Sequence, residues 1–159
     1  MTASVHLITG AGSGIGALLA RALLDRGDEV HVVARSERRA TELGEQLPGA
    51  RPLVADLEHP ESVESLRLPE RLDSVVHAAG VVALGPVADL SVQDWARQVQ
   101  VNLVAPAALT RVALPALRAA RGTVVLVNSG AGLFAHPQWS AYAASKHGLR
   151  ALADSLRAE

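Results

Sequence analysis

Residues 5–16 read VHLITGAGSGIG, an apolar run followed directly by a glycine-rich turn. The run lacks regular polar alternation, as expected of a strand buried in a parallel sheet. Apolar residues then follow at helical spacing before Gly27, namely Ile15, Leu18, Leu19, Ala22 and Leu23. Glycines between a strand and a helix allow a tight turn, close approach of the backbone to a pyrophosphate, and anion binding by the helix N-terminus. The stretch therefore predicts a dinucleotide-binding unit, and no Lys-Ser/Thr pair follows the glycines as a Walker A loop would require.

The same strand and helix signals repeat along the chain. Short runs rich in Val and Leu predict buried parallel strands at residues 5–8, 30–33, 53–55, 74–78 and 123–127. The helical patterns between them include a short helix at 60–66, a long helix from about residue 91 past residue 114 with local distortion at Pro106 and Pro115, and a last helix from near residue 140. This alternation predicts an α/β fold, a Rossmann-type doubly wound parallel sheet with three layers (α/β/α), in a single domain over residues 1–159.

Composition narrows the classes of function. The net charge of −1 and the sequence pI of about 6.6 provide no basic surface for nucleic acid. Cysteine is absent from the sequence, so no disulfide, thiolate metal site or cysteine nucleophile can form. None of the six histidines makes a ligand-like pair, and we expect no metal. The sequence starts without a basic leader, and no apolar run reaches membrane-spanning length, so we expect a cytoplasmic protein without a membrane partner.

The end of the second predicted strand bears on the choice of cofactor. An acidic residue at this place selects the free 2′-hydroxyl of the adenosine ribose in many dinucleotide sites. The sequence here reads Val33-Ala34-Arg35-Ser36, and the Arg35 guanidinium suits a 2′-phosphate instead. We therefore expect NADP(H) to be preferred over NAD(H). The alternative is that Arg35 belongs only to the solvated start of the next helix.

Tyr142 and Lys146 are the only tyrosine and the only lysine in the chain, and they stand four residues apart. At helical spacing they share one face, and an ammonium beside a phenol stabilises the phenolate, so Tyr142 is predicted to act as a general acid/base. Ser129 follows the fifth strand, at the edge where open α/β sheets bind ligands, and is expected to hydrogen-bond a substrate oxygen. Asn102 is an isolated amide in an apolar helix, and it needs a water or a backbone group as a partner.

These residues together resemble the classical short-chain dehydrogenase/reductase (SDR) family, and the likeness covers essentially all 159 residues. Thr9-Gly10, Gly14, Ile15 and Gly16 match the cofactor turn of that family, and Asp56-Leu57 match its adenine-contacting pair. Its catalytic tetrad is matched by Asn102, Ser129, Tyr142 and Lys146. The resemblance implies cofactor contacts from Gly10, Ser13, Gly14, Ile15, Gly16, Arg35, Asp56, Leu57, Ala79, Gly80, Tyr142 and Lys146.

The resemblance also implies how the catalytic roles are divided. Tyr142 exchanges a proton with the substrate oxygen, and Ser129 orients that oxygen. Lys146 holds the nicotinamide ribose and tunes Tyr142, while Asn102 positions a water. Hydride then moves between the nicotinamide and a small carbonyl or alcohol substrate. In the family, the helices that correspond to those starting near residues 91 and 140 pair subunits, which implies a homodimer or homotetramer.

Two features depart from the family pattern. The family usually has Asn-Asn-Ala-Gly after the fourth strand, whereas this chain has His77-Ala78-Ala79-Gly80, so His77 either takes part of the asparagine role or is structural. The family also continues past the Tyr-Lys helix with further strands and a substrate-covering loop, and this sequence stops at Glu159. A fifth strand without a neighbour leaves unpaired N–H and C=O groups at the sheet edge. We therefore expect these residues to be part of a longer enzyme and to be poorly active alone.

Two other functions stay open. One is a non-catalytic dinucleotide-binding module or regulator, which the missing C-terminal part of the family pattern would permit. The other is an extended-type sugar-nucleotide epimerase or dehydratase, which also uses a Tyr-xxx-Lys pair but differs in glycine spacing from the three-residue gap between Gly10 and Gly14. Phe134, His136 and Trp139 either line a substrate pocket or pack within their own loop.

Overall fold

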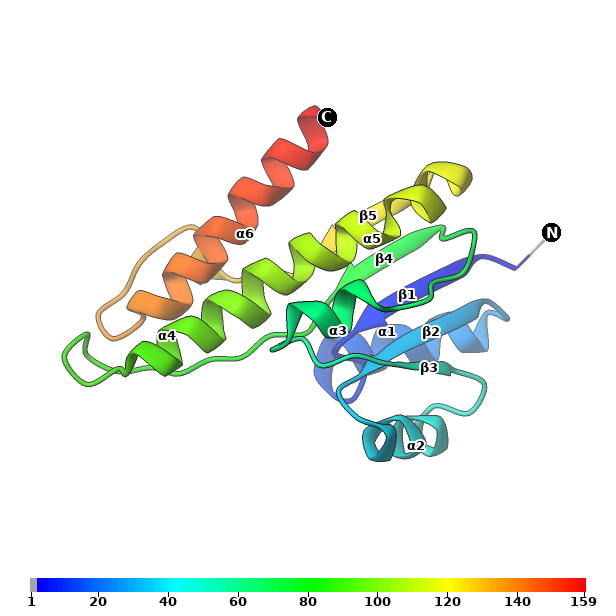
Figure 1. The fold of residues 1–159 in the computed structure, drawn as a ribbon, viewed down its shortest axis with the longest axis horizontal. Coiled ribbons are helices and arrows are strands. Elements are labelled where there is room, and N and C mark those ends of the chain that lie inside the picture. The colour runs from blue at the N-terminus through cyan, green and yellow to red at the C-terminus, as the bar shows by residue number, and fades with distance from the viewer. Residues whose placement is uncertain (1–2) are drawn as a thin grey trace.

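The computed structural model describes residues 3–159 as a parallel sheet and the helices that connect its strands (Figure 1). In chain order the elements are β1 (Val5–Thr9), α1 (Gly14–Asp25), β2 (Glu29–Ala34), α2 (Glu37–Gln46), β3 (Arg51–Val54), α3 (Pro60–Glu64), β4 (Ser74–His77), α4 (Val92–Val99), the π-helix η1 (Gln100–Val104), α5 (Ala105–Ala120), β5 (Thr123–Leu126), the 3-10 helix η2 (Gly130–Gly132) and α6 (Ser140–Ala158). All strand pairs are parallel, in the order β3-β2-β1-β4-β5. The predicted α/β doubly wound architecture is confirmed.

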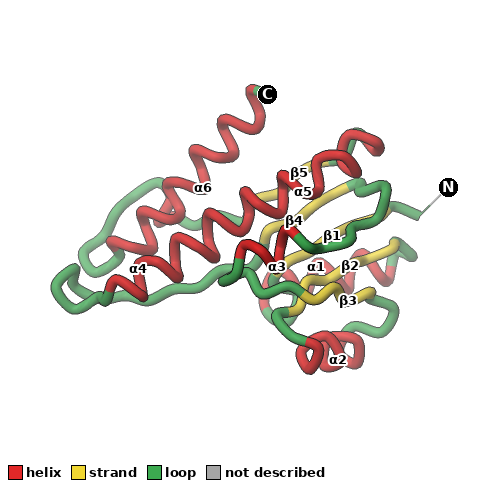
Figure 2. Tube along the Cα trace, in the orientation of Figure 1, coloured by secondary structure: helices red, strands yellow, loops and turns green. Residues whose placement is uncertain are grey.

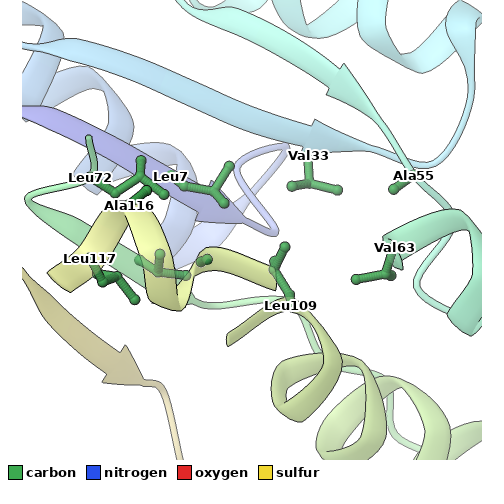
Figure 3. Close-up of a cluster of buried hydrophobic side chains, with 10 residues drawn as sticks. Leu7, Val33, Ala55, Val63, Leu72, Leu109, Ala116 and Leu117 are labelled. Carbon is green, nitrogen blue, oxygen red and sulfur yellow. The ribbon is translucent and has the colours of Figure 1, made fainter. Parts of the chain in front are cut away.

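Helices cover both faces of the sheet, with α3 and α5 on one side and α1 and α2 on the other, and α6 lies beside α4 and η1 (Figures 1 and 2). Neighbouring residues of a strand point to opposite faces, so Leu7 and Ile8 of β1 belong to two separate cores. Leu7 shares its core with Leu109 of α5 and Val63 of α3 (Figure 3). Ile8 shares the other core with Leu23 of α1. Leu7 and Ile8 are both completely buried, which makes β1 the centre of the three layers.

The predicted apolar stripe of α1 is wrong in part. Ile15 and Leu18 are 64% and 68% exposed, whereas Gly16, Ala20 and Leu23 form the buried face. The buried positions follow the 16, 20, 23 spacing because Gly16 is pressed against the glycine turn, and this contact sets the rotation of the helix about its axis. The larger apolar side chains at positions 15 and 18 therefore point away from the core.

The long predicted helix is present, and its hydrogen-bond pattern changes in the middle. α4, η1 and α5 follow one another without interruption over Val92–Ala120. Pro106 has no N–H, so the α-helical bond from position 106 to the carbonyl of Asn102 cannot form. The Ala105 N–H donates instead to the carbonyl of Gln100, five residues back. The distortion expected at Pro106 is thus the π-helix η1. As a result, the Asn102 carbonyl lacks its α-helical partner. Pro115 lies inside α5 without ending it.

This helix corrects the expectation that no apolar stretch reaches membrane-spanning length. Val92–Ala120 is 29 residues long and contains an 18-residue window with a mean hydropathy of 1.3, so by length and composition alone it is able to cross a membrane. In the fold it packs on the sheet, where Leu109 and Ala113 are completely buried. A core helix of a globular domain has the same composition, and the packing favours that interpretation.

Two buried amides of this helix hold the chain that follows β4. The Val81 N–H donates to Asn102 Oδ1 (2.8 Å), and Asn102 Nδ2 donates to the Val81 carbonyl (2.9 Å) and to the Ser145 hydroxyl (3.0 Å). One turn earlier, Gln98 Oε1 accepts from the Ala83 N–H (3.0 Å). Asn102 is completely buried and Gln98 is 1% exposed. The expected backbone partner of Asn102 is therefore found, and side chains satisfy backbone groups that no strand pairs.

Within residues 3–159, β5 is an edge of the sheet, as expected from its place in the sequence. Val125 at its centre is 42% exposed. Beside β5, the helices α5 and α6 border a groove of about 840 Å³, to which Leu117, Val125 and Leu156 contribute. None of the residues predicted to bind cofactor or substrate lines this groove. It therefore belongs to the sheet edge and not to the predicted site.

His77 ends β4 in a buried position. Its ring Nε2 lies 3.0 Å from the Thr110 hydroxyl, and the residue is 2% exposed. Burial lowers the pKa of His77 to about 4, so the imidazole is neutral near pH 7. The contacts favour the structural alternative for His77, because the ring joins β4 to α5.

We predict that His77 makes the fold acid-sensitive. An unfolded histidine binds a proton near pH 6.5 and His77 in the fold only near pH 4, so its contribution is fully present above pH 6.5 and is lost as the pH falls between these values. Between pH 7 and pH 5 the free energy of unfolding should fall by about 2 kcal/mol through this residue. Urea unfolding of the parent and of His77→Asn at both pH values measures this difference. An identical pH dependence in the two proteins would contradict the assignment.

We also predict that Asn102→Leu lowers the free energy of unfolding by about 2–4 kcal/mol. Leucine has a similar volume but leaves the Val81 N–H and C=O without their partners in a buried place. Gln100→Leu is the matched control, because Gln100 lies in the same π-helix and makes one side-chain bond, from Nε2 to the Leu57 carbonyl. Urea unfolding at pH 7 gives both values. A loss for Asn102→Leu no larger than that of the control would show that the hydrogen bonds between Asn102 and Val81 contribute little to the free energy of unfolding.

Candidate functional site

The carboxyl ends of β1, β4 and β5 bring the predicted site residues to one edge of the sheet. Thr9 is paired with His77, and His77 is paired with Leu126, so the three strands end at the same level. The glycine turn, residues 78–80 and residues 127–129 therefore leave the sheet next to one another. Open α/β sheets bind their ligands at this edge.

The glycine turn is packed directly on the chain that follows β4. Gly10 has φ +73, and a Cβ atom there would lie 2.6 Å from the Ala79 nitrogen. The Ala79 N–H donates to the Thr9 hydroxyl (3.1 Å). A Cβ atom at Gly16 would collide with the carbonyl of Gly10. These positions require glycine because two backbones and the start of α1 pass within contact distance.

The start of α1 is open to an anion. Gly14 has φ +53, and no atom from outside its neighbouring residues and its own helix backbone lies within 4 Å of the place where its Cβ would be. Ser13 occupies the N-cap position, and its side chain makes no capping hydrogen bond. The first N–H groups of a helix lack intrahelical partners and carry partial positive charge. Ser13, Gly14 and the exposed Ile15 thus border a place suited to a phosphate group.

A cleft of about 290 Å³ extends from this turn across the ends of β2 and β3. Six residues predicted to contact the cofactor line it: Gly10, Ser13, Arg35, Asp56, Leu57 and Ala79. Asp56 Oδ1 accepts from the Glu58 N–H (3.0 Å), which shapes the turn after β3. Arg39 and Arg97 also line the cleft, although the helical pattern predicted a solvated face for Arg39 and no role was predicted for Arg97. Arg35 precedes the N-cap Ser36 of α2 and Arg39 lies in the first turn of this helix, so the cluster of arginines around the helix start was the available signal.

Lys146 is buried beside Tyr142. Its Nζ donates to the Val127 carbonyl (2.9 Å) and lies 6.0 Å from the centroid of the Tyr142 ring. The residue is 5% exposed, and burial lowers the pKa of its ammonium below the ordinary value. A Cβ atom at Gly80 would lie 3.9 Å from Nζ and 3.4 Å from Asn102 Oδ1. Tyr142, Lys146, Gly80 and Asn102 therefore gather around one point.

Ser129 is placed by Asn128, a residue for which no role was predicted. The Ser129 N–H donates to Asn128 Oδ1 (2.9 Å), and Asn128 Nδ2 donates to the Lys146 carbonyl (3.2 Å). The Ser129 hydroxyl accepts from the Ala131 N–H (3.2 Å). Asn128 thus ties the end of β5 to α6. The scarcity of asparagine could have pointed to this residue, because Asn102 and Asn128 are the only asparagines in the chain.

The helix α6 is joined to the π-helix η1 through the buried hydroxyl of Ser145. Ser145 Oγ donates to the Tyr142 carbonyl (2.7 Å), and Asn102 Nδ2 donates to Ser145 Oγ (3.0 Å). Ser145 is 1% exposed. The sequence did not predict this role of Ser145, because a serine inside a helix more often bonds to its own backbone than to a second helix.

Aromatic rings precede Tyr142 along the chain. Trp139 lies edge-on to both His136 and Tyr142, with ring centroids 5.3 Å and 6.2 Å apart. Phe134 is 65% exposed. The Gly85 N–H donates to the Gln138 carbonyl (2.8 Å), so this loop contacts the loop after β4. A role of these rings in substrate binding stays a prediction. Residues 3–159 contain no group of three or more His, Asp or Glu able to hold a metal ion.

Comparisons with known sequences agree with the resemblance. The chain matches the short chain dehydrogenase family over residues 4–159. It is 33% identical over 175 residues to dehydrogenase/reductase SDR family member 7B of Xenopus laevis, which covers 100% of this chain and 54% of that protein. It is 32% identical over 158 residues to L-fucose dehydrogenase of Bos taurus, with 96% and 58% covered. The chain spans a little over half the length of these curated relatives.

Solved structures of related oxidoreductases have the same fold as this chain. A metagenomic short-chain oxidoreductase in complex with NADP superimposes with a TM-score of 0.84 at 32% identity, over 96% of this chain and 74% of that one. An alcohol dehydrogenase from the archaeon Thermococcus sibiricus, complexed with 5-hydroxy-NADP, has a TM-score of 0.85 at 27% identity, over 98% and 71%. The motifs, the strand order and these similarities lead to one assignment: the chain belongs to the short chain dehydrogenase family.

Proposed function

We propose that this chain forms the dinucleotide-binding and catalytic part of an NADP(H)-dependent oxidoreductase, which transfers a hydride between the nicotinamide and a carbonyl or alcohol substrate. The observation that carries the proposal is the meeting of two features at one sheet edge. Gly10 packs on Ala79. Gly80 follows Ala79 in the chain and lies close to Lys146 Nζ. A phosphate-binding turn and a proton-exchanging pair are thus joined by two adjacent residues.

The residues at this edge fit a dinucleotide. The glycines whose Cβ atoms would collide with backbone form a close-packed turn, and the open start of α1 provides N–H groups for a pyrophosphate. Gly10, Ser13, Gly14, Ile15 and Gly16 would hold this part, and Asp56 and Leu57 would border the adenine. When bound, the cofactor supplies or accepts the hydride at its nicotinamide ring. Ala79, Gly80 and Lys146 would lie along its second half.

Lys146 has the donors and the setting for two tasks. An ammonium has three N–H donors, and the Val127 carbonyl takes one, so two are available to ribose hydroxyls. The positive charge is buried 6.0 Å from the Tyr142 ring centroid, where the low local dielectric strengthens its action on the phenol oxygen. Lys146 would thereby favour the phenolate, and Tyr142 would exchange the proton with the substrate oxygen.

Ser129 and Asn102 would support that exchange. The Ser129 oxygen already accepts from Ala131 and has its own O–H left to donate toward a substrate oxygen. The side chain of Asn102 is fully used by its hydrogen bonds to Val81 and Ser145. The backbone carbonyl of Asn102 lacks an α-helical partner, so this carbonyl is the group suited to hold a water near Lys146. In this proposal the proton passes from Lys146 and that water toward Tyr142.

A second candidate function is a non-catalytic dinucleotide-binding module or regulator. It would bind the dinucleotide with the same glycine turn and cleft. Turnover with NADPH and a panel of carbonyl compounds separates it from the enzyme. An extended-type sugar-nucleotide epimerase or dehydratase has no observation in its favour. The predictions of a longer enzyme, of a homodimer or homotetramer, and of a cytoplasmic location stay predictions.

We predict that Tyr142→Phe leaves the Kd for NADPH within about threefold of the parent value and reduces carbonyl turnover by at least about 10³-fold, because only the proton-carrying oxygen is removed. Turnover is measured on the chain and on a form extended with the family's C-terminal part. Lys146→Ala should impair both NADPH binding and turnover, because two tasks depend on one ammonium. Comparable reduction rates for Tyr142→Phe and the parent would remove Tyr142 from the mechanism.

We predict that Arg35→Asp reverses the cofactor preference. The substitution replaces a partner for the 2′-phosphate with a carboxylate that repels it and suits a free 2′-hydroxyl. The ratio of the Kd values for NADPH and NADH should change by at least about 100-fold. Arg67→Asp, at a position that lines neither the cofactor cleft nor the β5 groove, controls for the change in net charge. A parent protein that already binds NADH more tightly would contradict the choice of NADP(H).

A further inference from the structure

Arg39 reaches from α2 to the glycine turn. Its Nη2 donates to the Gly12 carbonyl (3.4 Å), and a Cβ atom at position 12 would collide with the same nitrogen. Its side chain is 28% exposed and lines the cofactor cleft together with Arg35. The Arg39 guanidinium thus forms part of the cleft wall between the phosphate turn and the end of β2.

Glu42 is the anion that this guanidinium binds in the structure. Arg39 Nη1 donates to Glu42 Oε2 (2.8 Å), and Arg38 Nη1 donates to Glu42 Oε1 (2.8 Å). The hydrogen bond from Arg39, with the charges of Arg38, Arg39 and Arg35, holds the pKa of Glu42 below its ordinary value. One carboxylate is therefore within the field of three arginines, two of which line the cleft.

We propose that Arg35 and Arg39 together form the site for the 2′-phosphate of NADP(H), and that Glu42 is an internal competitor for Arg39 that limits the strength of the preference. The inference rests on the proposed function, because it requires that the adenosine end of a dinucleotide enters this cleft. It adds a second specificity-determining residue and a carboxylate that acts against it.

The charges explain why a phosphate would displace Glu42. A phosphate monoester carries about −1.5 to −2 charges and three acceptor oxygens, whereas a carboxylate carries one charge and two oxygens. A guanidinium has five N–H donors, of which Glu42 and Gly12 take one each. Arg39 has two further advantages as a ligand: its side chain is partly buried, and the Gly12 carbonyl orients it, which lowers the entropy lost on binding.

Arg38 provides a matched control. It donates to the other oxygen of the same carboxylate, but it is 79% exposed and does not line the cleft. A variant at position 38 removes one guanidinium and one ion pair with Glu42, as a variant at position 39 does, and leaves the cleft wall unchanged. Any effect of general positive charge on a phosphate should appear in both variants.

The test is isothermal titration calorimetry of NADPH and NADH with the parent, Arg39→Gln, Glu42→Gln, Arg38→Gln and the Arg39→Gln/Glu42→Gln double variant. We expect Arg39→Gln to weaken NADPH about tenfold and NADH less than twofold. Glu42→Gln should strengthen NADPH about three- to tenfold without changing NADH, and this gain should vanish in the double variant, since the competitor acts through Arg39. Arg38→Gln should change both Kd values less than twofold.

Other results would overturn the inference alone. Equal losses for NADPH and NADH in Arg39→Gln would mean that the side chain only supports the glycine turn through Gly12. A weaker affinity for NADPH in Glu42→Gln would mean that Glu42 orients Arg39 for the phosphate and does not compete with it. If the parent bound neither dinucleotide, the proposed function itself would fail, and the inference with it.

Discussion

The site depends on one close contact, in which the glycine turn after β1 crosses the chain that leaves β4. A side chain at Gly10 would collide with Ala79, and one at Gly16 would collide with the turn itself. The Thr9 hydroxyl completes the contact by accepting from the Ala79 N–H. Since α1 starts in this turn, the contact sets both the distance of the helix from the sheet and its rotation. It also brings the open helix start within reach of residues 79 and 80.

The second half of the site is held by buried polar groups. A buried amide or hydroxyl is costly unless it is paired, so each such group has a limited choice of positions. Asn102 joins the π-helix η1 to Val81 and Ser145, and Asn128 joins the end of β5 to the Lys146 carbonyl. These bonds connect β4, β5, the long helix and α6. The position of the Lys146 ammonium is a consequence of this network, because its helix cannot rotate without breaking several bonds.

The electrostatics of the cleft are local. The whole chain has a net charge of −1, yet Arg35, Arg39 and Arg97 all line one cleft. Arg39 and Arg97 are paired there with carboxylates, Glu42 and Glu58 respectively. A cleft built in this way presents guanidinium groups without a large positive field around the molecule. In the proposed function, binding of an anion would be an exchange of partners, and the affinity would depend on which carboxylates lose their guanidinium partners.

The sequence alone predicts the layered architecture, the order of the elements and the residues of the candidate site. The apolar strand runs, the glycine turn and the Tyr142–Lys146 spacing were sufficient, because periodicity and turn chemistry are local properties of a chain. It determined less about rotation and pairing. The burial of α1 at positions 16, 20 and 23 in place of 15 and 18 follows from a backbone contact with the turn, which no periodicity encodes. The distant partners of Asn102, Ser145, Asn128 and Arg39 are visible only in the folded chain, since these bonds join groups at least 18 residues apart, where sequence spacing carries no geometric information.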